Sequence, residues 1–300
     1  MQPHKLISFG ASSIDEYYYA DHVPQAGDKA IVTPSHEEIG GMIGNATSVY
    51  ASLGGTAAMI DFLPPTQATQ QIVESLTQNA IDTSLLTFGE EHHQSRCMIM
   101  LHEGERIVYV VSPKATPKTL SADHLAALGD FTTFYANVID FERLTNHQAV
   151  RSTGASIAFD VEETAIRAVK DPMLLLQVAD ILFINEQADD YLMTLRKDYK
   201  QFLHAPLVVI TKGAKGSQII TKEESIEIDV CPTTLVDTTG AGDTYNASFL
   251  YQFHQGQPLQ YCGRFASAAA ARAISMMGPR SGCGHVKDIL EYAATVDYLL

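Results

Sequence analysis

The sequence is poor in basic residues and has no long apolar run. It contains 20 Lys and Arg against 35 Asp and Glu, a formal net charge of −15. No excess of cations is available to displace counterions, so we expect no nucleic-acid partner and no anionic membrane surface. No apolar stretch approaches the roughly 18 residues that a membrane span needs. Met1–Leu6 lead directly into a strand-like run without a signal-peptide core, which predicts a cytoplasmic protein.

Cysteine is scarce and is not arranged in metal-binding or disulfide patterns. The chain has 4 cysteines without Cys-x-x-Cys spacing, which is typical of reduced thiols: Cys97, Cys231, Cys262 and Cys283. The short pairs His92–His93 and Cys283–His285 each lack a matching second pair. We therefore expect no structural metal.

Short apolar runs alternate with longer periodic ones over the 300 residues, and no internal repeat or low-complexity linker interrupts them. This pattern predicts one α/β domain spanning residues 1–300, with a mainly parallel sheet between two helical layers. The strand-like runs are Leu6–Phe9, Ala57–Phe62, Thr132–Tyr135, Ser156–Phe159, Ile181–Ile184 and Leu207–Ile210.

The sequence also predicts one edge hairpin and the helices that cover the sheet. Ser217–Thr221 and Ser225–Val230 predict an antiparallel hairpin at the edge of the sheet. The predicted helices are Thr66–Asn79, Thr164–Val178, Gln187–Arg196 and two alanine-rich segments at about 241–254 and 258–276.

A second hairpin lies apart from this pattern. Arg96–Leu101 and Arg106–Val111 are β-rich runs on either side of a short polar turn. With the aromatic stretch Tyr17–Thr33 they predict a small separate sheet formed by about residues 14–36 and 95–112. The segment is either a plain surface hairpin or a substrate-covering lid, and we expect the lid.

The most informative stretch is a glycine turn that opens a helix. Gly240-Ala241-Gly242 allows a tight turn, and an amphipathic helix follows directly. Free backbone N–H groups and the positive end of the helix dipole then point at one place, where phosphate charge can collect without lysine. Asp243 falls in the first helical turn beside this cradle, as a simple first-turn acid or as a general base.

Four segments, in order and over nearly the whole chain, resemble the ribokinase-like (PfkB) family of carbohydrate kinases. Asp237–Asp243 resembles its C-terminal signature, and Ile39–Ala46, followed by Leu53-Gly54-Gly55, its N-terminal one. Thr211–Ser217 is similar to the nucleotide-side strand and turn, and Gly104-Glu105-Arg106 occupies the place of the family's lid hairpin. The resemblance implies a three-layer α/β/α ribokinase-like fold with a small β-sheet lid.

The resemblance also implies the roles of the residues around the acceptor. Asp243 matches the catalytic base, and the backbone of Gly240, Ala241 and Gly242 matches the anion hole. The positions that match the sugar-binding residues are Asp15, Gly40, Gly41 and Asn45. From residue chemistry alone, Asp15 also fits a strand-end turn, and Gly44–Asn45 a helix start.

On the nucleotide side, four positions match residues near the ATP phosphates and base: Asn185, Thr211, Gly213 and Gly216. A monovalent-cation loop that some members carry matches the backbone around Ala273, Met276 and Gly278 and the side chains of Asp237, Thr239 and Ser281. The implied cofactors are ATP and Mg²⁺, with K⁺ as a further candidate.

One departure concerns magnesium. The resembled family has Asn-x-x-Glu after the strand Ile181–Ile184, and its glutamate organises the magnesium hydration shell. Here the run is Asn185-Glu186-Gln187-Ala188, so alanine stands at the glutamate position. Glu186, through water, and Asp189 are the nearest candidate substitutes, although they project in other directions from a helix.

The resemblance therefore implies an ATP-dependent kinase that phosphorylates a hydroxyl, most simply a primary one, of a small sugar-like molecule. A nucleoside kinase of the same family and a non-catalytic, sugar-binding regulatory relative are the alternatives. A homodimer formed through the lid is implied by analogy alone.

Overall fold

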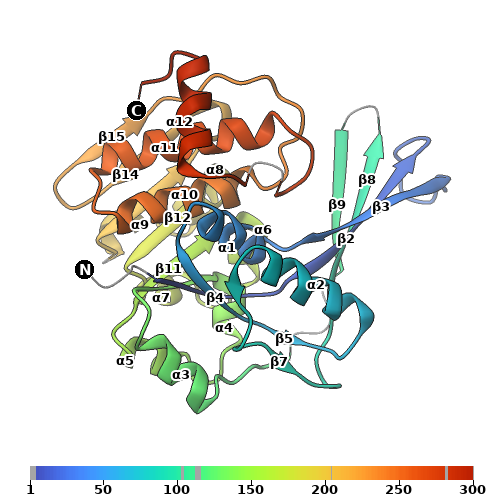
Figure 1. Cartoon of the computed structure of the whole chain (residues 1–300), viewed down its shortest axis with the longest axis horizontal. Coiled ribbons are helices and arrows are strands. Elements are labelled where there is room, and N and C mark those ends of the chain that lie inside the picture. Colours follow the sequence, from blue (N-terminus) through green and yellow to red (C-terminus); the bar gives the residue numbers. More distant parts are fainter. Residues whose placement is uncertain (1–4, 103–104, 112–115, 204, 281–282, 300) are drawn as a thin grey trace.

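The computed structural model describes residues 5–102, 105–111, 116–203, 205–280 and 283–299. Its centre is a twisted nine-stranded sheet in the order β15-β14-β13-β12-β11-β10-β1-β4-β6 (Figure 1). Seven strands run parallel: β13 (Leu207–Thr211), β12 (Ile181–Asn185), β11 (Ser156–Val161), β10 (Thr133–Asn137), β1 (Lys5–Phe9), β4 (Thr56–Ile60) and β6 (Ile81–Asp82). The antiparallel hairpin β14 (Ser217–Ile220) and β15 (Ser225–Ile228) forms one edge, as the sequence predicts.

The inner strands of the sheet send alternate side chains into two apolar cores. In β12, Ile181 and Phe183 join one core while Leu182 and Ile184 join the other. Residues of β1, β4, β10 and β11 divide between the two cores in the same way. A sheet buried on both faces needs a helical layer on each, and this confirms the expected three-layer α/β/α fold.

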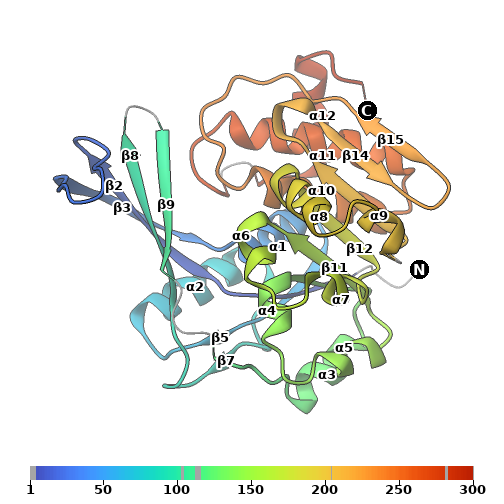
Figure 2. The ribbon, with the colours of Figure 1, turned by 180° about the vertical axis from the view of Figure 1, so that it is seen from behind.

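Among the described residues, five helices contribute to the first core and seven to the second (Figures 1 and 2). The first layer consists of α1 (Met42–Ser52), α2 (Gln67–Gln78), α10 (Ala241–His254), α11 (Leu259–Ile274) and α12 (Val286–Thr295). The second consists of α3 (Ala122–Leu128), α4 (Val138–Glu142), α5 (His147–Ser152), α6 (Glu163–Ala168), α7 (Pro172–Leu176), α8 (Glu186–Leu195) and α9 (Tyr199–Phe202). No helix in the described part of the chain has both the length and the apolar character to cross a bilayer.

The predicted helix Thr164–Val178 is wrong as a single element. The structure forms α6 and α7 instead, with Val169 extended at the end of α6. Pro172 explains the break, because a proline has no N–H and restricts the residue before it, yet fits the first turn of a new helix. Asp171 caps that new helix by accepting a hydrogen bond from the Leu174 N–H at 3.1 Å.

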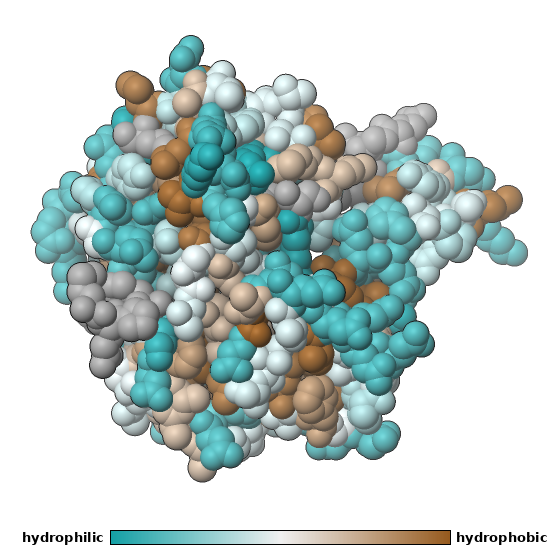
Figure 3. All heavy atoms as spheres, in the orientation of Figure 1, coloured by the Kyte–Doolittle hydropathy of each residue, from teal (hydrophilic) through white to brown (hydrophobic). Residues whose placement is uncertain are grey.

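A four-stranded sheet projects from the body as an arm (Figures 1 and 3). Its order is β3 (Val32–Gly40), β2 (Ser13–Ala20), β8 (Ser95–His102) and β9 (Glu105–Val111), and we call it the lid sheet. A separate pair, β5 (Phe62–Leu63) and β7 (Thr87–Phe88), lies nearby. Large apolar side chains of the lid sheet and its connecting loop are exposed: Val23, Ile31, Val32, Met98, Val108, Tyr109, Val110 and Val111. Covering of substrate and dimerisation through this sheet stay predictions.

The second core supplies a direct test of the layer assignment. Leu192 of α8 is fully buried, whereas Leu195 of the same helix is 47% exposed. Leu192→Ala is expected to lower the free energy of unfolding by about 2–5 kcal/mol, because it leaves a cavity between α8 and the sheet. Leu195→Ala is the matched control and should change it by no more than about 0.5 kcal/mol. Urea unfolding measures both, and equal losses would contradict the packing described.

Candidate active site

The candidate site lies at the carboxyl ends of the parallel strands, where open α/β sheets bind ligands. Asn185 and Thr211 are the last residues of β12 and β13 and are partners in strand register. Asp160 lies one residue before the end of β11. The start of α10 faces these strand ends, because Gly242 and Asp243 line one small cavity with all three.

The glycine turn before α10 has a conformation that needs glycine. Gly240 is the N-cap residue of this 14-residue helix and has φ 73°. A side chain there would bring its Cβ within 2.4 Å of the Pro279 carbonyl oxygen. Gly242 has no heavy atom within 4 Å of the place its Cβ would occupy, so a ligand can approach the backbone closely. The Ala241 N–H already donates to the Thr238 carbonyl at 3.3 Å, which tightens the turn.

Asp243 stands in the first turn of α10, 8% exposed, and accepts a hydrogen bond from Asn45 Nδ2 at 2.9 Å on Oδ2. Burial raises the pKa of Asp243 to about 7. The Asn45 bond and the charge of Arg280 oppose this rise, whereas the negative charges of Glu162 and Asp15 add to it. A carboxyl with a pKa near neutrality is suited to exchange a proton with a ligand.

Arg280 is a site residue that the sequence analysis missed. Its Nε donates to Asn45 Oδ1 at 2.8 Å, and its terminal nitrogens donate to Ser75 Oγ at 2.9 Å and to the Gly40 carbonyl at 3.5 Å. Arg280 thereby fixes the direction of the Asn45 amide, whose N–H then faces Asp243. No local pattern marks Arg280 in the sequence, because its partners lie more than 200 positions away.

Asp15 and the glycine pair meet where the lid sheet joins the body. Asp15 is 6% exposed, and its Oδ1 accepts a hydrogen bond from Ser13 Oγ at 2.7 Å. A Cβ on Gly40 would lie 2.0 Å from the Asp15 carboxylate, so only glycine leaves room for this acid. Gly41 has φ 97° and is the N-cap residue of α1, four positions before Asn45, which bonds to Asp243.

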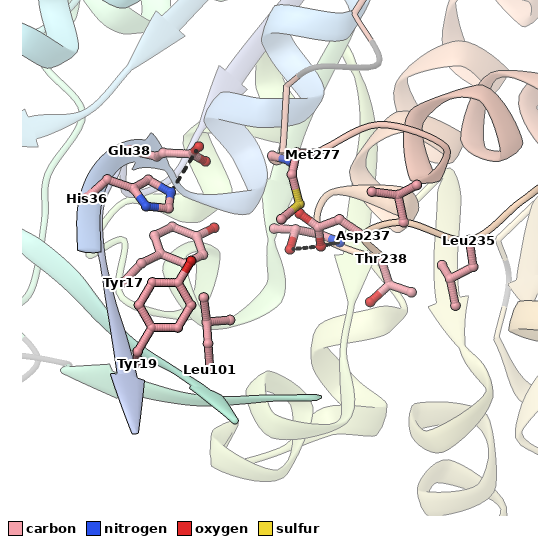
Figure 4. A pocket seen from close by; sticks show the side chains of 12 residues that line it. Tyr17, Tyr19, His36, Glu38, Leu101, Leu235, Asp237, Thr238 and Met277 are labelled. Carbon is pink, nitrogen blue, oxygen red and sulfur yellow. Dashed lines mark hydrogen bonds and ion pairs between the residues drawn. The ribbon is translucent and has the colours of Figure 1, made fainter. Parts of the chain in front are cut away.

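A cavity of about 250 Å³ lies between the lid sheet on one side and the loop before α10 and the loop after α11 on the other (Figure 4). Tyr17, Tyr19 and His36 form its lid wall, and Asp237, Thr238 and Met277 lie opposite. The rings of Tyr17 and His36 stack at 4.5 Å between centroids with 6° between planes.

Glu38 lies in the same cavity, directly opposite Asp15 in strand register. His36 Nε2 is 3.5 Å from Glu38 Oε1, and Glu38 Oε2 is a buried oxygen without a hydrogen-bond partner. Burial raises the pKa of Glu38, His36 opposes this, and the nearby charges of Asp237 and Asp15 add to it. The cavity is therefore aromatic on one side and acidic in character.

The positions predicted to bind nucleotide divide into two places. Asn185 and Thr211 line the small cavity beside Asp243, and Asn185 Oδ1 also caps α8 by accepting from the Ala188 N–H at 2.8 Å. Gly213 and Gly216 form the turn after β13 with φ 55° and 84°. This turn closes with a 2.8 Å bond from the Lys212 N–H to the Gly216 carbonyl.

The loop predicted to hold a monovalent cation is tied together by Asp237. Its Oδ1 accepts from the Thr239 N–H and hydroxyl at 2.9 and 2.6 Å, and its Oδ2 accepts from the Gly278 N–H at 2.9 Å. The Ala273 carbonyl accepts from the Met276 N–H at 3.1 Å. Ser281 lies outside the described residues.

The small cavity contains three further polar groups that the sequence analysis did not name: Asp160, Glu162 and Asn246. Asn246 follows Asp243 by three positions, so helical spacing alone places both on one side of α10. Asp160 follows the run Ala158-Phe159 at a strand end, as Asn185 follows its own strand. These two signals are present in the sequence, whereas Glu162 shows no comparable one.

Comparison with known proteins finds solved structures with this fold and a family model that matches the sequence. The profile described as "pfkB family carbohydrate kinase" matches residues 3–284. A nucleoside kinase of Methanothermobacter thermautotrophicus is 26% identical over 291 residues, covering 92% of this chain and 91% of the relative. The structure of Arabidopsis thaliana ribokinase complexed with ribose and ATP has a TM-score of 0.81 at 23% identity, covering 97% and 99%. An E. coli chain in complex with ATP and Mg²⁺ has a TM-score of 0.74 at 17% identity, with the same coverage. Because the profile spans nearly the whole sequence, the chain belongs to the pfkB family of carbohydrate kinases.

Proposed function

We propose that this ATP-dependent carbohydrate kinase transfers the γ-phosphoryl group of ATP to a primary hydroxyl of a small, uncharged, sugar-like acceptor, with Asp243 as the base. The observation that carries the proposal is the position of Asp243 at the start of α10. It is buried, hydrogen bonded to Asn45 and adjacent to the glycine turn Gly240–Gly242.

In this mechanism each site residue has one task. The acceptor hydroxyl donates a hydrogen bond to Asp243 Oδ1, while Asn45 holds Oδ2. The acceptor oxygen attacks the γ-phosphorus, the bond to the bridging β,γ-oxygen breaks, and Asp243 takes the hydroxyl proton late in the step. The backbone N–H groups of Gly240 and Gly242 and the positive end of the α10 dipole stabilise the charge on the transferring oxygens, while the Ala241 N–H holds the turn through Thr238. Mg²⁺, when bound, neutralises part of the phosphate charge.

The acceptor must suit an acidic pocket. Asp15 and Glu38 accept hydrogen bonds from hydroxyl groups, and the Arg280 guanidinium is already bonded to Asn45, Ser75 and Gly40. Among the described residues that line the 250 Å³ cavity there is no lysine or arginine. A sugar acid or a sugar phosphate would therefore bring like charges together, which disfavours it.

A nucleoside is the second candidate acceptor, and the stacked pair Tyr17–His36 favours it. Aromatic side chains on a cavity wall offer a flat surface on which a base can stack. The relatedness to a nucleoside kinase supports the same candidate. A sugar without a base would leave this wall uncovered.

Release of ADP with a panel of acceptors tests the proposal and separates the candidates. The panel holds ribose, fructose, adenosine, inosine and a sugar acid, each with MgATP. Turnover of a neutral sugar or nucleoside is expected, and turnover of the sugar acid is not. A thermal shift with sugars but no ADP release from any of them would instead support a non-catalytic, sugar-binding relative.

Replacement of the base supplies the residue-level test. Asp243→Asn is expected to keep the fold and to lower kcat by about 10²–10⁴-fold, because the amide does not accept the hydroxyl proton. Circular dichroism establishes that the variant is folded. Activity within tenfold of the original protein would remove Asp243 from the role of base.

The raised pKa of Asp243 also predicts a stability effect with a definite sign. The pKa of Asp243 is 3.8 in the unfolded chain and about 7 in the folded one. Between these two pH values, the folded chain keeps a proton that the unfolded chain has released. Ionisation of this buried group therefore lowers stability as the pH rises through this range. Asp243→Asn, which stays neutral, should be more stable than the original protein at pH 8, on the order of a few kcal/mol, and nearly equal to it at pH 4.

Urea unfolding at pH 4 and pH 8 measures this difference. Asp130→Asn, a change at an exposed acid, is the control and should show no comparable gain at pH 8. A difference between Asp243→Asn and the original protein that is the same at both pH values would contradict the pKa described.

We also propose that K⁺ binds beside the loop held by Asp237 and Thr239, and that it activates the enzyme through the adjacent glycine turn. The bonds from Asp237 to Thr239 and Gly278 support this, because they join the two segments of the predicted loop. Turnover is expected to rise several-fold when KCl replaces N-methylglucamine chloride at equal ionic strength. Equal rates in the two salts would rule out potassium activation.

A further inference from the structure

The two carboxylates of helix α8 that the sequence offers in place of the family's glutamate, Glu186 and Asp189, are both paired with other side chains. Ala188 is fully buried in the second core, at the position where the family has its glutamate. Glu186 is paired with Lys215 Nζ at 2.7 Å. Asp189 accepts hydrogen bonds from the Tyr199 hydroxyl and from Lys200 Nζ, the latter at 3.0 Å, so it is held in the layer of helices. The two substitutes nearest in sequence are thus both occupied.

The end of β11 brings two other carboxylates to the phosphate side of the site. Asp160 and Glu162 line a cavity of about 40 Å³ together with Asn185, Thr211, Gly242, Asp243, Asn246 and the ring of Phe183. None of these described lining residues is basic. One water needs roughly 10–15 Å³ of such space, so the cavity has room for an ion with some of its water. It borders Gly242, where the phosphates are proposed to lie.

Asn246 gives an independent indication that a polar ligand belongs in this cavity. It is 4% exposed, and its Nδ2 donates to the Tyr135 hydroxyl at 3.3 Å, whereas its Oδ1 has no hydrogen-bond partner. Buried amide oxygens are nearly always satisfied, by protein or by water. Asp160 Oδ2 accepts from the same Tyr135 hydroxyl at 3.0 Å, so Tyr135 holds the Asn246 amide and the Asp160 carboxylate side by side.

We propose that Asp160 and Glu162 hold the Mg²⁺ of MgATP, directly or through its bound water, in place of the glutamate that α8 lacks. This assignment rests on the proposed kinase function. Asn246 Oδ1 completes the oxygen-lined wall by accepting a hydrogen bond from the water of the ion. Glu162, the first residue after β11, is the group on which the assignment depends most.

The donor set suits magnesium. Mg²⁺ prefers oxygen ligands, retains several waters and is usually held by one or two carboxylates together with nucleotide phosphates. In the described residues no three His, Cys, Asp or Glu side chains converge as a self-sufficient metal cluster. A site of two carboxylates that is completed by the nucleotide agrees with both facts. A cation also offsets the cost of burying like charges beside Asp243.

Manganese binding, followed by electron paramagnetic resonance, tests the assignment without relying on turnover. Mn²⁺ is titrated into the protein saturated with a non-hydrolysable β,γ-imido ATP analogue, and Mg²⁺ is then added as competitor. Glu162→Gln and Asp160→Asn are each expected to weaken the affinity for Mn²⁺ in this complex by about 10–100-fold. Glu163→Gln, the neighbouring residue whose carboxylate pairs with Arg167 at the surface, is the matched control and should bind Mn²⁺ as the original protein does.

The outcomes separate this assignment from the proposed function. Asp243→Asn removes a charge from the wall of the same cavity but none of the proposed ligands, so it should weaken Mn²⁺ binding less than Glu162→Gln does while losing turnover. If the original protein binds the analogue and Mn²⁺, and both Glu162→Gln and Asp160→Asn do so equally well, the assignment is overturned and the kinase proposal stands. If the original protein binds no analogue and shows no turnover, the kinase proposal itself fails. Glu162→Asp keeps the charge and should recover part of the Mn²⁺ affinity that Glu162→Gln loses. A folded Glu162→Asp variant without any recovery would also count against the assignment.

Discussion

The hydrogen bond between Asn45 and Asp243 is the interaction on which the arrangement of the site depends. It joins the first helix of the chain to α10 across 198 positions of sequence. Arg280 fixes the other end of the Asn45 amide, so a single line of contacts sets the direction of the carboxylate. Since Gly41 begins α1 and Gly240 begins α10, both helices start at glycines with positive φ, and their first turns meet at the candidate base.

Periodicity and turn chemistry were sufficient to predict the fold class and most strands of the central sheet, whereas the helices α3, α4, α5, α9 and α12 were not predicted. Helix α10 has the expected bounds, and the hairpin β14–β15 lies at the edge of the sheet where alternating apolar residues placed it. The break between α6 and α7 was missed, because apolar spacing continues across Pro172 even though the backbone does not. The spacing of apolar residues identifies where helices and strands occur, but a proline within such a run decides whether it forms one helix or two.

The candidate site was predictable only where its residues belong to a motif. Asp15, Asn45 and Asp243 lie in recognisable segments, and the structure brings Asn45 and Asp243 into contact and places Asp15 nearby. Arg280 and Glu162 belong to the site only because the fold brings them there, and nothing in the neighbouring sequence indicates their distant partners. The same limit applied to Glu186, whose pairing with Lys215 depends on the turn after β13.

The strand β2 has a consequence for how acceptor choice can change over evolution. Its inner end carries Asp15 beside the body, whereas Tyr17 and Tyr19 lie farther along the lid sheet, on the wall of the larger cavity. Substitutions at those outer positions would reshape the cavity proposed to take the acceptor without touching the contact between α1 and α10. In such an architecture new acceptors can be acquired one lid residue at a time, while phosphoryl transfer is inherited unchanged.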